Sequence, residues 1–307
     1  MADDEKRPSA SWARSSVIAL GSSAAAAGRF CRRKPLGALG GLIVVGLIVI
    51  AVFADRIARY DYDETIAGAR MNPPSARFWM GTDNLGRDMW SRVVFGARAS
   101  VTVGFGAVLV GTVLATLIGV TSGYFAGGYD AVVQRVVDAW QSFPFLIIIL
   151  SLMAVLGPGI LNVILALGVV GAAGASRVIR SATIAVTGNA YVEAARALGC
   201  GHLRILARYV LPNVAAPIII LATIGLGSAI LAESALSFLG FGVPPPYPSW
   251  GGMLSGSGRS YMYQAPWMAL WPGVAISLVV YGFNMLGDAL RDVLDPRLRG
   301  ASGRPVR

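Results

Sequence analysis

Side chains that commonly carry catalytic chemistry are scarce in this chain of 307 residues. The two lysines, Lys6 and Lys34, do not follow a glycine, so neither completes the Gly-Lys-Ser/Thr sequence of a phosphate-binding loop. His202 is the single histidine, and the two cysteines, Cys31 and Cys200, form no cluster with it. We therefore predict no catalytic residue, no metal site and no cofactor in this chain itself.

An amphipathic stretch at residues 189–212 carries the most unusual pattern of polar and apolar side chains. Read at helical spacing, it has one apolar face before Gly199 and Gly201 and a second one after them. The faces consist of Tyr191, Ala194, Ala195 and Leu198, and then of Leu203, Leu206, Ala207 and Val210. We predict two short helices at an angle, closed by Pro212, which cannot continue a helix interior. Such an element suits a groove on another protein, and the alternative is a helix lying on the membrane surface.

The composition places these residues in a membrane protein. Hydrophobic residues make up 55% of the chain and charged residues 14%, and the mean hydropathy is +0.63. Because about 20 residues cross the hydrocarbon core, the uncharged runs predict an all-α fold with six transmembrane helices. The predicted spans are Leu36–Ala54, a helix within Ala99–Tyr129, a helix from near Ala131 to the Gly157-Pro158-Gly159 turn, a helix from that turn to Ser176, Val214–Ala232, and Pro266–Gly287.

The distribution of Lys and Arg predicts that both termini are cytoplasmic. Of the 26 basic residues, 17 lie in the segments that this orientation places inside, 1–34, 177–208 and 291–307, and eight lie in the outer loops. These residues flank spans, so we expect anionic lipid rather than nucleic acid as their partner. The N-terminal tail 1–34 is predicted to precede an uncleaved anchor, and both cysteines to be cytoplasmic and unpaired.

Charged residues near the spans need a reason, because a charge in the hydrocarbon core is costly. Arg135 and Asp138 are predicted to form an intrahelical ion pair in the third span. Glu233 ends the fifth span and is our candidate for a polar group at an outer gate, with a hydrogen bond to the neighbouring loop as the alternative.

Further candidates for this gate lie in the outer loops. The turn residues around Asp83 and Asp88 suit a capped loop, in which Arg87 can form local ion pairs. Trp250 follows a proline-rich run, which fits either a rigid lid over the outer mouth or an anchor at the membrane interface.

The amphipathic stretch also resembles a family signature, the EAA loop of ABC-importer permeases, written E-A-A-x3-G-x9-I-x-L-P. The matching residues are Glu193, Ala194, Ala195, Gly199, Leu211 and Pro212. Tyr209 stands where the pattern has isoleucine. In that family the loop docks on a cytoplasmic ATPase.

Three other segments are similar to the dipeptide and oligopeptide permeases of the OppC and DppC type. They are Gly-Thr-Asp-Asn-Leu-Gly-Arg-Asp at 81–88, Glu-Ser-Ala-Leu-Ser-Phe-Leu-Gly-Phe-Gly at 233–242 with the prolines and Trp250 after it, and the run from Phe283 to Arg297. The resemblance covers about residues 36–299. It implies a type I ABC importer permease fold, with a first helix and outer loop at 35–98, a permease core at 99–290 and a cytoplasmic tail at 291–307.

The resemblance further implies a function in the bacterial cell membrane. The chain is expected to form half of a pathway for peptides, beside a homologous second permease. Two cytoplasmic ABC ATPases would supply ATP and Mg²⁺ chemistry, and an extracytoplasmic binding protein would deliver the substrate. One alternative substrate is nickel or another small solute. An alternative of a different class is a secondary transporter driven by an ion gradient, which should carry ionisable residues at mid-bilayer, where this sequence is nearly devoid of them.

Overall fold

The computed structural model describes residues 34–294, and everything outside two isolated bridge residues, Thr82 and Asp88, is helix, turn or loop. Predictions for the tail 1–33, for Cys31 and for the segment 295–307 fall outside the described residues. The helices are α2 (Pro35–Val52), α3 (Ala54–Ile57), α4 (Met89–Phe125), α5 (Gly127–Gln141), α6 (Phe145–Leu156), α7 (Ile160–Thr187), α8 (Ala190–Ala197), α9 (His202–Ile205), α10 (Leu211–Phe238), α11 (Trp250–Leu254), α12 (Ser257–Ser260) and α13 (Trp267–Leu294).

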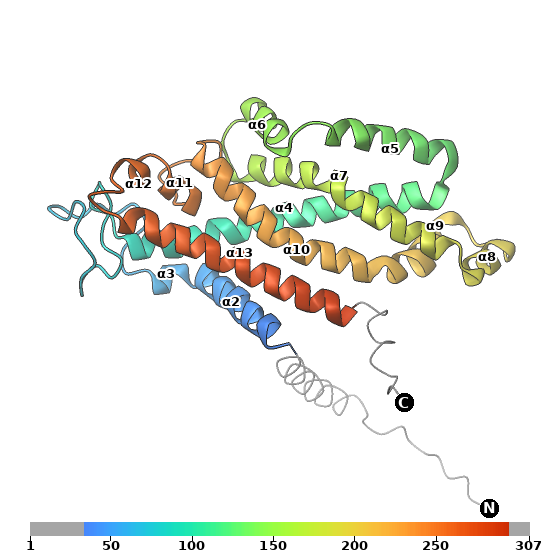
Figure 1. Ribbon diagram of the computed structural model, residues 1–307, viewed down its shortest axis with the longest axis horizontal. Helices are drawn as coiled ribbons and strands as arrows, with labels where there is room; N and C mark the ends of the chain where they lie inside the picture. The colour runs from blue at the N-terminus through green and yellow to red at the C-terminus, as the bar shows by residue number, and fades with distance from the viewer. Residues whose placement is uncertain (1–33, 295–307) are drawn as a thin grey trace, which may run out of the picture.

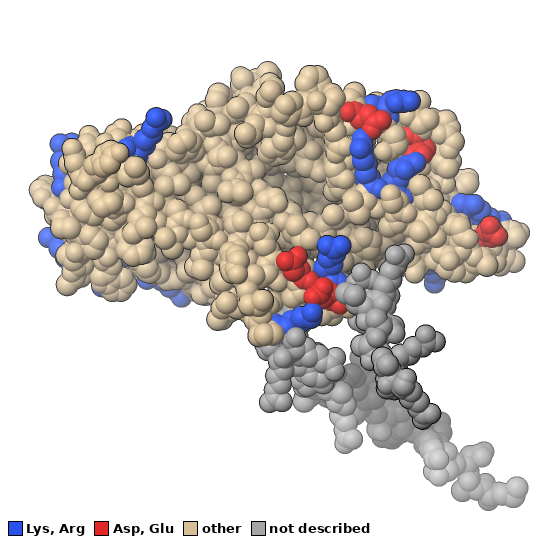
Figure 2. Space-filling model, viewed as in Figure 1, with Lys and Arg blue, Asp and Glu red and all other residues tan. Residues whose placement is uncertain are grey.

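The long helices form an elongated bundle (Figure 1). Within residues 34–294, five helical stretches are long and apolar enough to cross a membrane, and the bent pair α5–α6 is a candidate for a sixth span. Charged side chains lie at one end of the bundle and over its opposite half, and a broad uncharged belt separates the two groups (Figure 2). This belt is the surface expected to face lipid. The all-α membrane fold predicted from the sequence is therefore confirmed.

The prediction of a single helix from near Ala131 to the Gly157-Pro158-Gly159 turn is wrong. The structure divides it into α5 and α6, which meet at an angle of 88°. Pro144 lies at the break and has no N–H to donate, and it also disfavours helical geometry at Phe143 before it. The predicted pair between Arg135 and Asp138 is wrong as well, because Asp138 pairs with Arg177 of α7.

Helix α4 is the centre of the bundle. It has 37 residues and begins ten residues earlier than the apolar run, because the Asp88 side chain accepts a hydrogen bond from the Ser91 N–H and so caps the helix. Buried residues of α4 take part in each hydrophobic cluster of the described chain. Small residues allow this packing: a Cβ at Gly119 would lie 2.6 Å from the Ser176 carbonyl oxygen of α7.

The first helix, α2, packs against the last one, α13. A Cβ at Gly40 would lie 2.6 Å from the carbonyl oxygen of Gly282, so the two backbones are in direct contact there. At the end of this pair, Lys34 Nζ lies 2.5 Å from Asp292 Oδ2. The chain therefore enters the bundle at α2 and leaves it at α13 at neighbouring points (Figure 1).

The predicted break at Pro212 is absent. A π-helical turn, Leu206–Val210, joins α9 to α10, and the helical stretch His202–Phe238 is continuous. Pro212 lies in the first turn of α10, where a missing N–H is tolerated. The wider π turn accommodates the extra residue that would otherwise break the helix.

Candidate functional site

A protruding element of the structure corresponds to the amphipathic stretch. It consists of α8, α9 and the turn between them, residues 190–205, and is called the knob here. The turn depends on Gly199, which has φ +76°. The N–H of Gly199 donates to the Arg196 carbonyl and the N–H of Cys200 donates to the Ala195 carbonyl, a Schellman motif that ends α8. Residues with a Cβ disfavour this backbone conformation, so glycine is required here for the angle between the helices.

The base of the knob is buried in the bundle. Val192 has no exposed surface and Ala195 is 4% exposed, and they pack in one cluster with Ile205 and Val210. The sequence analysis missed Val192, because it assigned the face that contains Tyr191 as the apolar face of this helix. The spacing of Val192, Ala195 and Gly199 at i, i+3 and i+7 was the signal that marks this face.

The tip of the knob is apolar but points away from the chain. Leu198 is 84% exposed and Leu203 is 80% exposed, and Tyr191 is 43% exposed beside them. Two further predicted contact residues, Glu193 and Ala194, are also exposed. The predicted single apolar face is therefore divided, with Ala195 inward and the other three residues outward.

An aromatic pair ties the knob to the end of α4. The Tyr124 hydroxyl and His202 Nδ1 lie 2.9 Å apart. The Arg196 guanidinium lies over the Tyr124 ring at 5.1 Å from its centroid, in a cation–π contact. Tyr124 is 6% exposed, so it fixes the knob from beneath. Tyr124 was not among the predicted site residues, because nothing in its local sequence indicates a contact 78 positions away.

At the opposite end of the bundle, the predicted outer residues form a buried charge cluster. Asp83 Oδ2 lies 2.6 Å from Arg87 Nε, as predicted for a local ion pair. Asp83 Oδ1 also accepts the N–H groups of Leu85 and Arg87, at 2.8 and 3.0 Å. Asp88 does not pair with Arg87, since its carboxylate accepts from the N–H and the hydroxyl of Ser91 at the start of α4.

Glu233 is enclosed by protein. It has no exposed surface, and Ser237 Oγ donates to its Oε1 at 2.7 Å. The hydrogen bond comes from one turn later in the same helix rather than from the neighbouring loop, although Ser237 Oγ accepts the Val243 N–H from that loop at 3.4 Å. In this conformation Glu233 does not line an open pathway, and its role at a gate stays a prediction.

Trp250 is not an anchor at the membrane interface, so that interpretation is wrong. It is 2% exposed, and its indole N–H donates to the Val93 carbonyl of α4 at 2.9 Å. The ring packs over Gly96, where a Cβ would lie 2.7 Å from the indole. Trp250 therefore holds α11 and the proline-rich loop before it against α4.

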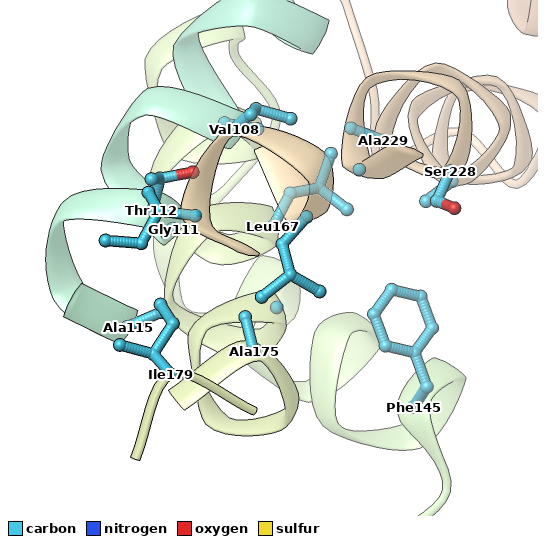
Figure 3. Close-up of a pocket in the computed structure, with 16 residues that line it drawn as sticks. Val108, Gly111, Thr112, Ala115, Phe145, Leu167, Ala175, Ile179, Ser228 and Ala229 are labelled. Atoms are coloured by element: carbon cyan, nitrogen blue, oxygen red, sulfur yellow. The ribbon is translucent and has the colours of Figure 1, made fainter. Parts of the chain in front are cut away.

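A cavity of about 240 Å³ lies in the membrane part of the bundle (Figure 3). Its walls come from α4, α7 and α10, with Phe145 of α6 beside them. Small and apolar residues such as Gly111, Ala175 and Ala229 line it, and Thr112 and Ser228 add hydroxyl groups. No group of three or more metal-ligating side chains occurs in residues 34–294.

Together these features define a helical multi-pass membrane protein with a protruding knob. The family model of binding-protein-dependent transport system inner membrane components matches residues 115–300. That of the N-terminal transmembrane domain of oligopeptide transport permease C matches residues 26–74. The chain therefore belongs to the family of binding-protein-dependent transport system inner membrane components, and it is a permease subunit of an ABC importer in the bacterial inner membrane.

Named relatives cover most of the chain. The dipeptide transport system permease protein DppC of Alkalihalophilus pseudofirmus is 41% identical over 268 residues, 87% of this chain and 88% of that protein. The di/tripeptide permease DppC of Pseudomonas aeruginosa is 41% identical, with 87% and 90% covered, and the glutathione permease GsiD of Escherichia coli is 39% identical, with 88% and 89% covered.

Solved structures agree on the fold. The inward-facing MetNI methionine ABC transporter gives a TM-score of 0.55 at 22% identity, with 67% of this chain and 97% of that chain covered. This likeness extends to the fold alone.

Proposed function

We propose that this chain forms one half of the translocation pathway of an ATP-driven importer for short peptides. A second permease would complete the pathway, an extracytoplasmic protein would deliver the peptide, and two ATPases would dock on the cytoplasmic knob. The peptide substrate is supported by the names of the relatives, which transport dipeptides, di- and tripeptides, and glutathione. ATP hydrolysis would belong to the partner subunits.

One observation carries the docking role: Leu198 and Leu203 are exposed on the knob while its base is buried. Burying a leucine fully stabilises an interface by about 1.5–3 kcal/mol, so two leucines can contribute a large share of an ATPase contact. A buried base and the tie to Tyr124 keep this surface in a fixed position, so that a displacement of the ATPase is passed to the helices.

The test replaces both leucines by serine in the complex of both permeases and the ATPases. The double variant L198S/L203S should fold and insert normally, because both side chains are exposed. It should co-purify at least tenfold less ATPase and lose stimulation of ATP hydrolysis by the binding protein.

A matched control is Tyr263→Ser, which alters a side chain that is 95% exposed at the other end of the bundle. We expect this control to retain both ATPase subunits. Full assembly and full stimulated hydrolysis by L198S/L203S would show that the knob does not dock the ATPase.

A further inference from the structure

A second cavity, of about 320 Å³, lies at the outer end of the bundle under the proline-rich loop. It is bounded by residues 244–249, by α11 and by the loop before α4. Three charged residues line it: Asp83, Arg87 and Arg92. The formal charge of its lining is therefore +1. Asp63, whose charge acts on Arg92, is exposed and does not line the cavity.

The single carboxylate that lines the cavity, that of Asp83, already accepts hydrogen bonds from the protein. Asp83 accepts two backbone N–H groups and the Arg87 Nε–H, and Arg92 Nε lies 3.7 Å from its Oδ2. Within residues 34–294, each of the two guanidinium groups still has N–H groups that are not hydrogen-bonded. Arg87 Nη1 and Nη2 have no hydrogen-bond partner among the described residues, and Arg92 uses Nη1 for the Tyr62 carbonyl at 2.8 Å but has no partner for Nη2. A planar fork of such donors matches a carboxylate.

The walls of the cavity are stiff and carry further donors. Four prolines, at 244, 245, 246 and 248, restrict the loop, and Trp250 fastens its end to α4. Ser257 lines the cavity with a hydroxyl group, and so does Ser255, whose hydroxyl donates to the Gly252 carbonyl at 2.9 Å. Tyr247 lines it too, and its phenol is protonated at neutral pH, so the hydroxyl can donate. A preformed site with fixed donors loses little entropy when a ligand binds.

We propose that this cavity binds the free carboxylate of the transported peptide, with Arg87 as the principal ligand and Arg92 beside it. The inference rests on the proposed function. Dipeptides, tripeptides and glutathione, the substrates in the names of the relatives, all carry a free carboxylate. A lining of net charge +1 suits one carboxylate group and disfavours a divalent cation such as nickel. Asp83 shapes the loop through the two N–H groups on its Oδ1, and its Oδ2 competes with the ligand for the Arg87 guanidinium.

The binding test uses the assembled complex in lipid nanodiscs without binding protein. Saturation-transfer difference NMR compares two probes, Ala-Ala and its C-terminal amide. Wild type should give a signal for Ala-Ala at least five times that for the amide. Arg87→Gln should abolish this preference, and Arg87→Lys should restore part of it, because lysine keeps the charge but not the fork.

The variant Asp83→Asn tests whether Arg87 binds the peptide or serves only as the ion-pair partner of Asp83. Asparagine retains Oδ1 for the two N–H groups, and the lost charge raises the net charge of the lining to +2. Binding of Ala-Ala should therefore increase, by about twofold or more. If Arg87 mattered only for the ion pair, D83N and R87Q would weaken binding alike, and that result would overturn the proposal.

Two further measurements separate the remaining outcomes. R87Q could instead leave Ala-Ala binding intact and weaken capture of the binding protein. That result would mean that Arg87 binds a carboxylate of the binding protein rather than of the peptide, and it would overturn the proposal. ATP-driven uptake of Ala-Ala by wild-type proteoliposomes with binding protein tests the proposed function separately. Uptake without a carboxylate preference in the NMR experiment refutes this inference alone, whereas absence of uptake refutes the peptide-import function.

Discussion

Single residues determine the shape of the knob in ways that the sequence indicates only in part. Gly199 was predictable as a break, because two glycines interrupt the helical pattern there. Which of the two glycines is required was not, since that depends on φ: +76° at Gly199 and −64° at Gly201. The buried side of α8 was also misassigned, because Val192 and Tyr191 are both apolar and only the packing against Ile205 separates them.

The difference in φ leads to a prediction. Gly199→Ala forces a side chain into the left-handed region, at a cost of about 1–2 kcal/mol, and should lower coupled ATP hydrolysis by tilting α8. Gly201→Ala changes a residue of the same type two positions away without this strain. ATPase assays of the two purified complexes should therefore differ, with G201A close to wild type. Equal activity of the two variants would show that coupled ATP hydrolysis does not require the Schellman turn.

At the scale of elements, hydropathy predicted the helices but not how they bend. The Gly157-Pro158-Gly159 turn was predicted correctly, since α6 ends at Leu156 and α7 begins at Ile160. The bend between α5 and α6 was missed because Pro144 lies within an uncharged run that reads as one span. Ion pairs between helices, such as the one between Asp138 and Arg177, depend on the position of α5 beside α7, which a one-dimensional pattern does not contain.

Contact between α2 and α13 gives a prediction at this scale. Gly40→Leu places a side chain against the backbone of Gly282, and overpacking of this kind costs about 1–3 kcal/mol. The thermal midpoint of the purified complex should fall by several degrees. Gly46→Leu is the matched control, because its Cβ would meet nothing within 4 Å. A midpoint for G40L equal to that of G46L would mean that the two helices do not need close contact.

At the scale of the whole molecule, composition predicted the membrane class, and the arrangement of Lys and Arg predicted the orientation. The fold and the family are confirmed, and the orientation remains a prediction. The cavity cluster of Asp83, Arg87 and Arg92 could not be predicted as a unit, because it also needs a loop about 160 residues later in the chain to form its walls.

Orientation can be tested in intact cells. In a variant with both native cysteines replaced by serine, Tyr263→Cys should react with an impermeant thiol reagent, and Leu198→Cys should react only after the cells are opened. Both positions are strongly exposed, at 95% and 84%, so the difference would report the side of the membrane rather than burial. The reverse pattern would place the knob outside, where a cytoplasmic ATPase cannot reach it.

Helix α4 is longer than the membrane is thick. Its 37 residues extend about 55 Å, against about 30 Å for the hydrocarbon core, and its sequence contains no proline. One end lies beside the outer cavity through Arg92, and the other holds the knob through Tyr124 and His202. A rigid tilt of about 5° about one end therefore moves the other by about 5 Å, roughly one helical turn. If the proposed ATPase docks on the knob, nucleotide binding there would change the width of the proposed peptide site on the far side of the membrane through the leverage of a single helix.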